Sequence, residues 1–190
     1  MIIGTSFAAG LNVYATIGCL GLLSHFGVIH LPDALHVLES WWIISASVAL
    51  FVVEFFADKV PAFDLVWNAL HTFVRVPVAA FLAYAAGSQL SPEMQLVSTL
   101  VGGAVAFAAH GGKTAIRAAV TPSPEPFSNM ALSLGEDVVA ISLTWIATNH
   151  PFIGAGVVIA FLVVIVFAVR WVVRSLLRLF QGASRKLSRV

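Results

Sequence analysis

Six apolar stretches alternate with short polar or proline-containing segments along the chain, and each stretch has about 20 residues or more. A helix of about 20 apolar residues is long enough to cross the hydrocarbon core of a bilayer. The pattern therefore predicts an all-α integral membrane protein with six transmembrane helices. The stretches cover approximately residues 2–28, 34–57, 63–86, 94–120, 127–148 and 151–180.

The composition supports the same fold class. The 190 residues are 59% hydrophobic and 10% charged, with a mean hydropathy of +0.96, whereas soluble domains carry about 25% charged residues. We expect one transmembrane domain over residues 1–181 and a basic tail over residues 182–190. Cys19, the single cysteine, excludes an intrachain disulfide. The first stretch lacks a positively charged start, which argues against a cleavable signal peptide.

The distribution of lysine and arginine predicts the orientation. With both termini inside, the basic residues fall at or near the cytoplasmic face, apart from Arg75 within the third stretch, and the three outer connections carry none. Basic residues accumulate on the cytoplasmic side of membrane proteins. We therefore expect a multi-pass protein of the bacterial inner membrane with both termini in the cytoplasm. The net charge of +1 gives no indication of a nucleic-acid partner.

A faint internal repeat is visible. Residues 34–45 and 131–142 share Ala, Leu, Glu, Ile and Ser in step, and the Phe-Ala-Ala of residues 7–9 returns at residues 107–109. A unit of three spans must be inserted upside down when it is repeated, as in many transporters. The pattern predicts two inverted three-helix repeats, over about residues 1–90 and 91–181. Chance similarity between Ala- and Leu-rich helices is the alternative.

Ionisable side chains within the apolar stretches are the strongest indication of a functional site, because each costs several kcal/mol in lipid unless it is paired or hydrated. Helical spacing places them on polar stripes of several helices, enough to line a hydrated cavity. The candidate binding residues are Asn12, Glu39, Glu54, Asp58, Asp64, His71, Arg75, His110, Lys113, Arg117, Glu136 and Asp137. Asn68 and Thr16 lie on the same stripes.

Three other interpretations remain open for these residues. They could be structural ion pairs, such as Arg117 with Glu136 or Asp137. Oxygen and imidazole ligands could bind a divalent cation, although no spacing matches a known metal motif, and no other cofactor is expected; the candidate ligands are Glu54, Asp58, Asp64, His71 and His110. The His-Gly-Gly-Lys of residues 110–113 could bind an anion, or let two helices approach closely.

The basic C-terminal region has a simpler interpretation. Arg170, Arg174 and Arg178 are four residues apart, and Trp171 adjoins them. Arginine and tryptophan at a membrane interface contact anionic lipid head groups and fix the topology. We expect a lipid anchor here.

The sequence resembles a family of small bacterial membrane proteins designated domain of unknown function 4126. The resemblance rests on residues 10–14, residues 54–61 with Asp64, residues 71–75, residues 109–113 with Arg117, residues 123–129 and residues 135–137. It implies an integral membrane location and no established activity.

We expect a transporter or channel for a small polar solute or ion, with Glu39 and Glu136 as a central acidic pair. A buried carboxyl group can change charge as access alternates, so proton or cation coupling is compatible with this arrangement. The alternatives are an enzyme or scramblase acting on lipid head groups, and a structural subunit of a membrane complex. The small-residue faces would also allow a homodimer.

Overall fold

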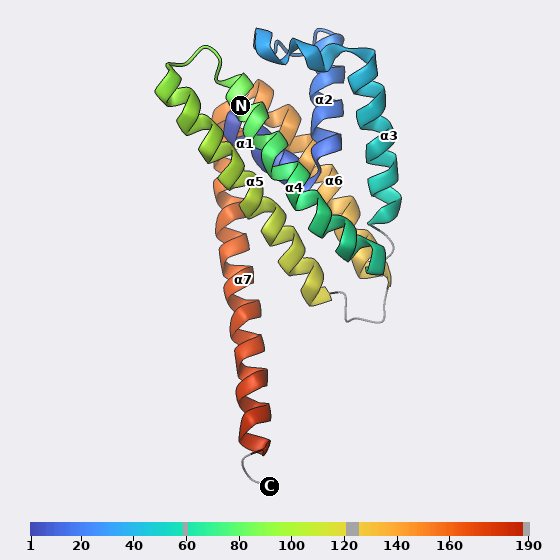
Figure 1. Ribbon diagram of the computed structural model, residues 1–190, viewed down its shortest axis with the longest axis vertical. Coiled ribbons are helices and arrows are strands. Elements are labelled where there is room, and N and C mark those ends of the chain that lie inside the picture. Colours follow the sequence, from blue (N-terminus) through green and yellow to red (C-terminus); the bar gives the residue numbers. More distant parts are fainter. Residues whose placement is uncertain (59–60, 121–125, 188–190) are drawn as a thin grey trace.

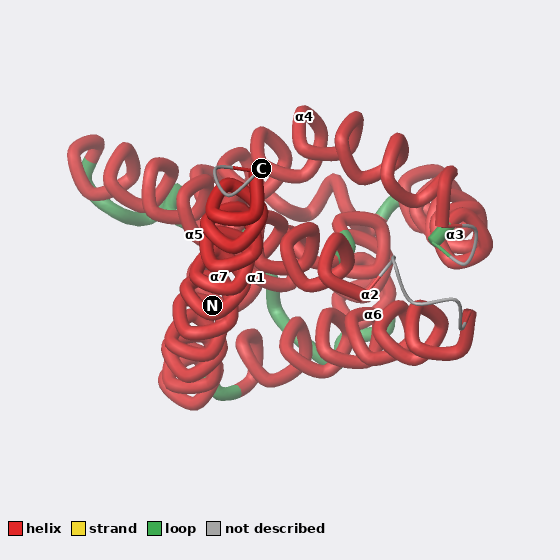
Figure 2. Tube along the Cα trace, turned by 90° about the horizontal axis from the view of Figure 1, so that it is seen from below, coloured by secondary structure: helices red, strands yellow, loops and turns green. Residues whose placement is uncertain are grey.

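The structure is a computed structural model that describes the chain except for residues 59–60, 121–125 and 188–190. The described residues form helices and connecting loops, with no strand among them (Figures 1 and 2). In chain order the elements are α1 (Ile2–Leu11), α2 (Val13–His25), the 3₁₀ helix η1 (Asp33–Glu39), α3 (Trp41–Ala57), α4 (Pro61–Ala86), α5 (Pro92–Val120), α6 (Pro126–Asn149) and α7 (Pro151–Leu187).

Proline marks the start of the four long helices. Pro61, Pro92, Pro126 and Pro151 are the first residues of α4, α5, α6 and α7. Proline suits this position because its fixed φ is helical and the first turn has no intrahelical acceptor for its missing N–H. The prolines that separate the apolar stretches in the sequence therefore set where these helices begin.

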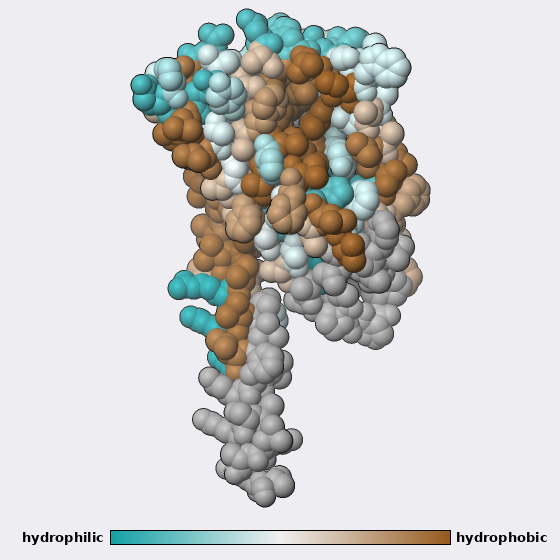
Figure 3. Space-filling model, in the orientation of Figure 1, coloured by the Kyte–Doolittle hydropathy of each residue, from teal (hydrophilic) through white to brown (hydrophobic). Residues whose placement is uncertain are grey.

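Four helices contain segments that are long and apolar enough to cross a membrane: Val66–Ala86, Pro92–Arg117, Met130–Asn149 and Pro151–Trp171. Together, η1 and α3 form a fifth candidate, bent by 66°. Apolar residues cover much of the outer surface (Figure 3). Among them, Phe73 is 81% and Phe152 92% exposed. An apolar surface of this extent indicates a multi-pass membrane protein. The expected number of six spans is not confirmed.

The first expected span is a helical hairpin. Near its start, α1 contacts α6 at Ala147 through Gly4, and the chain then breaks at Asn12, which bonds Asp137. From there α2 runs back along α6, with Cys19 at Ile141 and Leu23 beside Trp145. Thus α1 is antiparallel to α6 and α2 is parallel to it. The outer ends of the hairpin lie on the same side of the bundle (Figure 1).

Packing of small residues places α1 in the centre of the bundle. Every residue from Gly4 to Leu11 is buried, and α1 contacts α2, α4, α5, α6 and α7. A Cβ atom on Gly10 would lie 2.5 Å from the Ala106 carbonyl oxygen and 2.8 Å from the Ala106 Cα. The absence of a side chain at Gly10 thus lets the backbones of α1 and α5 approach closely.

The inverted repeat is not confirmed. Residues 7–9 lie in the short helix α1 of the hairpin, whereas the matching residues 107–109 lie in the middle of the continuous 29-residue helix α5. The two segments therefore belong to different local structures.

The last helix extends well past the rest of the bundle (Figure 1). It has 37 residues, or roughly 55 Å at about 1.5 Å per residue, which is longer than the roughly 30 Å of hydrocarbon in a bilayer. Its apolar first half packs on α5 and α6.

Candidate functional site

Charged side chains from four helices meet in a buried ion-pair network. Glu54 of α3 and Arg75 of α4 form a direct ion pair, and both side chains are fully buried. Lys113 of α5 lies 3.9 Å from the Glu54 carboxylate. Because no water reaches these groups, each charge depends on its protein partners for stabilisation.

The network continues along α5. Lys113 Nζ lies 3.2 Å from Asp58 and 3.1 Å from Glu136, and Arg117 Nη2 lies 3.1 Å from Asp58 and 2.6 Å from Glu136. The four-residue spacing places both cations on one face of α5, so they share the same two carboxylates. Of these side chains, Glu136 is the most exposed, at 12%.

Asp58 directly follows α3 and is held ionised by its partners. Burial alone would raise the pKa of its carboxyl group, but the cations of Lys113 and Arg117 outweigh burial and hold this pKa below its ordinary value. Arg117 also donates to the Asp58 backbone carbonyl, at 3.3 Å. Asp58 thereby joins the end of α3 to α5.

Uncharged polar side chains also form hydrogen bonds with Arg75. Its Nη1 donates to Asn68 Oδ1 at 3.0 Å and to His110 Nδ1 at 2.9 Å. A guanidinium group cannot accept, so His110 Nδ1 must be the acceptor and the ring proton lies on Nε2. This Nε2–H points to Thr72 Oγ1 at 2.8 Å and to the Asn68 carbonyl at 3.1 Å. His110 is therefore neutral and orients Arg75 towards Glu54.

The break between α1 and α2 lies beside the network. Asn12 is extended, with φ −148° and ψ 103°, and its Oδ1 accepts from the Ala15 amide and caps α2. Its Nδ2 donates to Asp137 Oδ1 at 2.9 Å. On the other side of the break, the Leu11 carbonyl accepts from Lys113 at 3.3 Å. A cation at the carbonyl end of α1 is favourable for the helix dipole.

Nine of the expected site residues come together in and around this network: Asn12, Glu54, Asp58, Arg75, His110, Lys113, Arg117, Glu136 and Asp137. The suggested pairing of Arg117 with Glu136 is confirmed. His71 donates to the Trp67 carbonyl at 2.8 Å and contacts the Tyr14 hydroxyl at 3.0 Å. The side chain of Asp64 lies outside the described residues.

The expected central pair of Glu39 and Glu136 is wrong. Glu39 ends η1, where its carboxylate accepts from Ser24 at 2.7 Å and lies 3.5 Å from His36. Its side chain is 31% exposed. The bend between η1 and α3 takes Glu39 out of the helix that was expected to carry it into the bundle.

No group of three or more His, Cys, Asp or Glu side chains is placed to hold a metal ion within the described part of the chain. Glu54 and Asp58 instead form ion pairs with the side chains of Arg75 and Lys113, and His110 accepts a hydrogen bond from Arg75. Positive side chains at these positions would repel a divalent cation.

Two site residues were missed in the sequence, Thr72 and Tyr14. Thr72 is four residues after Asn68 and so shares the polar stripe of α4, a signal that could have included it. Tyr14 lies two residues after the break. Its contact with His71 depends on the hairpin, which the sequence pattern did not indicate.

A surface cleft reaches the network from one side. It has a volume of about 640 Å³ and lies between α1, α5, α6 and α7. Its walls include Phe7, Leu132, Phe161 and Val164, and among the described lining residues the charged ones are Lys113 and Glu136. The cleft thus combines a mostly apolar lining with two charged residues of the network.

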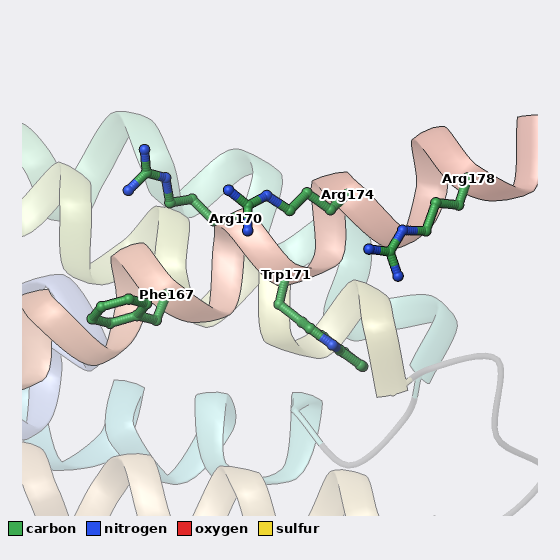
Figure 4. Close-up of a pocket in the computed structure, with 5 residues that line it drawn as sticks. All are labelled: Phe167, Arg170, Trp171, Arg174 and Arg178. Carbon is green, nitrogen blue, oxygen red and sulfur yellow. The ribbon is translucent and has the colours of Figure 1, made fainter. Parts of the chain in front are cut away.

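The protruding part of α7 carries the expected basic group. Arg170, Arg174 and Arg178 line a shallow surface depression with Phe167 and Trp171, and Trp171 projects from a different side of the helix than Arg170 and Arg174 (Figure 4). Cations and an exposed indole on successive turns of a helix suit contact with lipid head groups.

Comparison with known protein families gives a match over most of the chain. A model of the family described as domain of unknown function (DUF4126) matches residues 1–171, which include the whole network and the hairpin. The chain belongs to this family. The family's description assigns no activity, so the site must be interpreted from its own chemistry. No curated protein and no solved structure matches the chain.

Proposed function

We propose that this member of the family is a carrier or channel for a small polar solute or an ion, and that its binding site is the network beside Asn12. The observation that carries the proposal is the break in the hairpin, which exposes the Leu11 carbonyl and the Asn12 side chain to Lys113 and Asp137. Broken helices whose ends meet charged groups inside the bundle are a recurring form of transporter site.

The energetics of the network support a functional role. Buried ion pairs add little net stability, because the desolvation of two charges offsets their attraction. Three cations and three carboxylates are therefore more than helix packing requires. Their side chains come from α3, α4, α5 and α6, so a relative movement of these helices would exchange partners within the network.

For the topology, we propose that η1–α3, α4, α5, α6 and α7 each cross a bacterial inner membrane and that the hairpin enters from one side only. Lys113, Arg117 and the arginines of α7 lie towards the same end of the bundle, which the distribution of basic residues favours as the cytoplasmic end. Five crossings put the end of α7 in the cytoplasm and Met1 on the opposite side, so the proposed topology departs from the expectation of two cytoplasmic termini.

Replacing Glu136 with glutamine tests the carrier proposal. Glu136 neutralises Lys113 and Arg117 and is the network carboxylate most exposed to the cleft. Wild-type protein in proteoliposomes on a solid-supported membrane should produce a charge movement after jumps in pH or divalent-cation concentration. We expect Glu136→Gln to abolish this current.

The matched control is Glu93→Gln, the same change at an exposed position at the start of α5. It should leave the current unchanged. A wild-type protein that gives no current under either jump, or a Glu136→Gln variant with full current, would contradict the proposal.

The cleft favours a second candidate, the movement of lipids between leaflets. An apolar cleft lined in part by Lys113 and Glu136 could shelter a polar head group while the acyl chains stay in the membrane. Val164 lines the cleft, and its neighbour Val163 does not, although both are exposed on α7.

Lipid movement can be measured in liposomes that contain head-group-labelled lipid, with a membrane-impermeant quencher added outside. For a scramblase, the wild type should expose all the label, Val164→Trp should slow the exposure by filling the cleft, and Val163→Trp should not. Quenching limited to the outer leaflet in wild-type liposomes would exclude this function.

A further inference from the structure

The carboxyl groups around the network outnumber the cations. In and around the network, the described side chains include four carboxyl groups, Glu54, Asp58, Glu136 and Asp137. They include three cations, Arg75, Lys113 and Arg117. Every cation pairs with one or more of the first three carboxylates. Within this part of the chain, Asp137 is left without an ion-pair partner.

The surroundings of Asp137 are unfavourable for a permanent charge. The residue is 5% exposed, its Oδ1 accepts from Asn12 Nδ2 at 2.9 Å, and its Oδ2 is buried without a hydrogen-bond partner. A buried carboxylate with one neutral donor is poorly compensated for lost hydration, whereas a protonated carboxyl group carries no charge. Both protonation states are therefore accessible to this group.

The charged groups that act on Asp137 have opposing effects. Lys113 on α5 favours the carboxylate, and Glu54 and Asp58 on the α3 side disfavour it. Glu136 is adjacent on α6, and α7 presents no charged residue before Arg170. From the hairpin, the facing group is the Asn12 amide. A rearrangement of the Lys113 pairs would thus change the affinity of Asp137 for a proton.

Asp137 is also connected to the break. The same Asn12 side chain that bonds Asp137 caps the first turn of α2 with its oxygen. The N-terminal end of a helix favours a negative charge nearby, so the carboxylate holds the hairpin against α6 more strongly than the neutral acid does. Protonation of Asp137 would loosen this contact.

We propose that Asp137 is the proton-binding site that couples transport to proton movement, with the hairpin as the element that responds. This inference rests on the proposed carrier function and names its coupling ion. It moves the coupling role from Glu136, which is neutralised by two cations, to the adjacent carboxyl group.

Infrared difference spectroscopy of the reconstituted protein between acidic and alkaline pH tests the proposal without requiring flux. At a pH where exposed carboxyl groups are already ionised, the wild type should still show a C=O stretching band of a protonated carboxyl group, and this band should disappear as pH rises further. Asp137→Asn should abolish this band, whereas the matched change Glu136→Gln on the next residue should retain it. Asp137→Glu should restore a band at a shifted position, which also guards against misfolding of the asparagine variant.

A wild type without a titrating band, or a band that survives in Asp137→Asn, would overturn the proposal. A titrating band that is lost in Asp137→Asn, in a protein without measurable current, would support the proton site and count against the carrier. The two proposals therefore fail separately.

Discussion

Replacing Arg75 with methionine is expected to destabilise the protein by about 3–5 kcal/mol, because breaking a buried ion pair leaves an uncompensated charge inside the bundle. Glu54 would lose its nearest cation, and the Asn68 and His110 acceptors would lose their donor. At about 2–4 °C per kcal/mol for a chain of this length, Tm should fall by about 6–20 °C. Thermal unfolding in detergent, followed by circular dichroism, measures the change.

Two variants show whether the loss comes from the buried pair. Arg170→Met makes the same chemical change on the exposed part of α7 and should leave Tm nearly unchanged. Combining Arg75→Met with Glu54→Gln removes the stranded charge and should recover part of the loss. A double variant that is less stable than Arg75→Met would show that the pair is not the source of the effect.

Replacing Gly10 with alanine should destabilise the bundle by about 1–3 kcal/mol, the usual cost of overpacking a core. The new Cβ would lie 2.5 Å from the Ala106 carbonyl oxygen and 2.8 Å from Ala109 Cβ, so the backbones of α1 and α5 would have to separate. This cost exceeds the roughly 0.5–1 kcal/mol that alanine gains over glycine within a helix. The same unfolding measurement in detergent detects it.

Gly111→Ala is the matched comparison on α5. A Cβ at Gly111 would meet no atom within 4 Å, so the variant gains helix propensity without a clash. We expect its Tm to equal or exceed that of the wild type. A Gly10→Ala variant as stable as Gly111→Ala would show that α1 and α5 do not pack as closely as described.

Helical periodicity was sufficient to predict which of the buried polar residues share a helix face. Asn68 and Arg75 are seven residues apart on α4, and His110 and Lys113 are three apart on α5, so each pair had to share a face of its helix. Charges on neighbouring apolar helices then had to find each other, because lipid offers no alternative partner. This reasoning located the network, including the pair between Arg117 and Glu136.

The hairpin could not be predicted from hydropathy. α1 and α2 are both apolar, and Asn12 is a single polar residue between them, so the composition matches that of one continuous span. The contacts that stabilise the break are tertiary. The Leu11 carbonyl accepts a hydrogen bond from Lys113, and the side-chain amide of Asn12 donates one to Asp137. Both partners are more than 100 residues away in the chain.

The error at Glu39 has a different origin. Its role was inferred from a sequence match with Glu136, yet the match does not consider what surrounds each residue. Ser24 and His36 lie close in the chain and bind Glu39 locally, whereas Glu136 faces two cations on α5. Similar residues at similar spacing therefore carry different roles here.

The hairpin also has a consequence for biogenesis. With 10 and 13 residues, α1 and α2 measure roughly 15 and 20 Å, and neither can cross the roughly 30 Å of hydrocarbon alone. Its packing partners α4, α5, α6 and α7 are all synthesised later. The hairpin is synthesised before these helices and must therefore reach its final position after them, once they have been inserted and assembled around it.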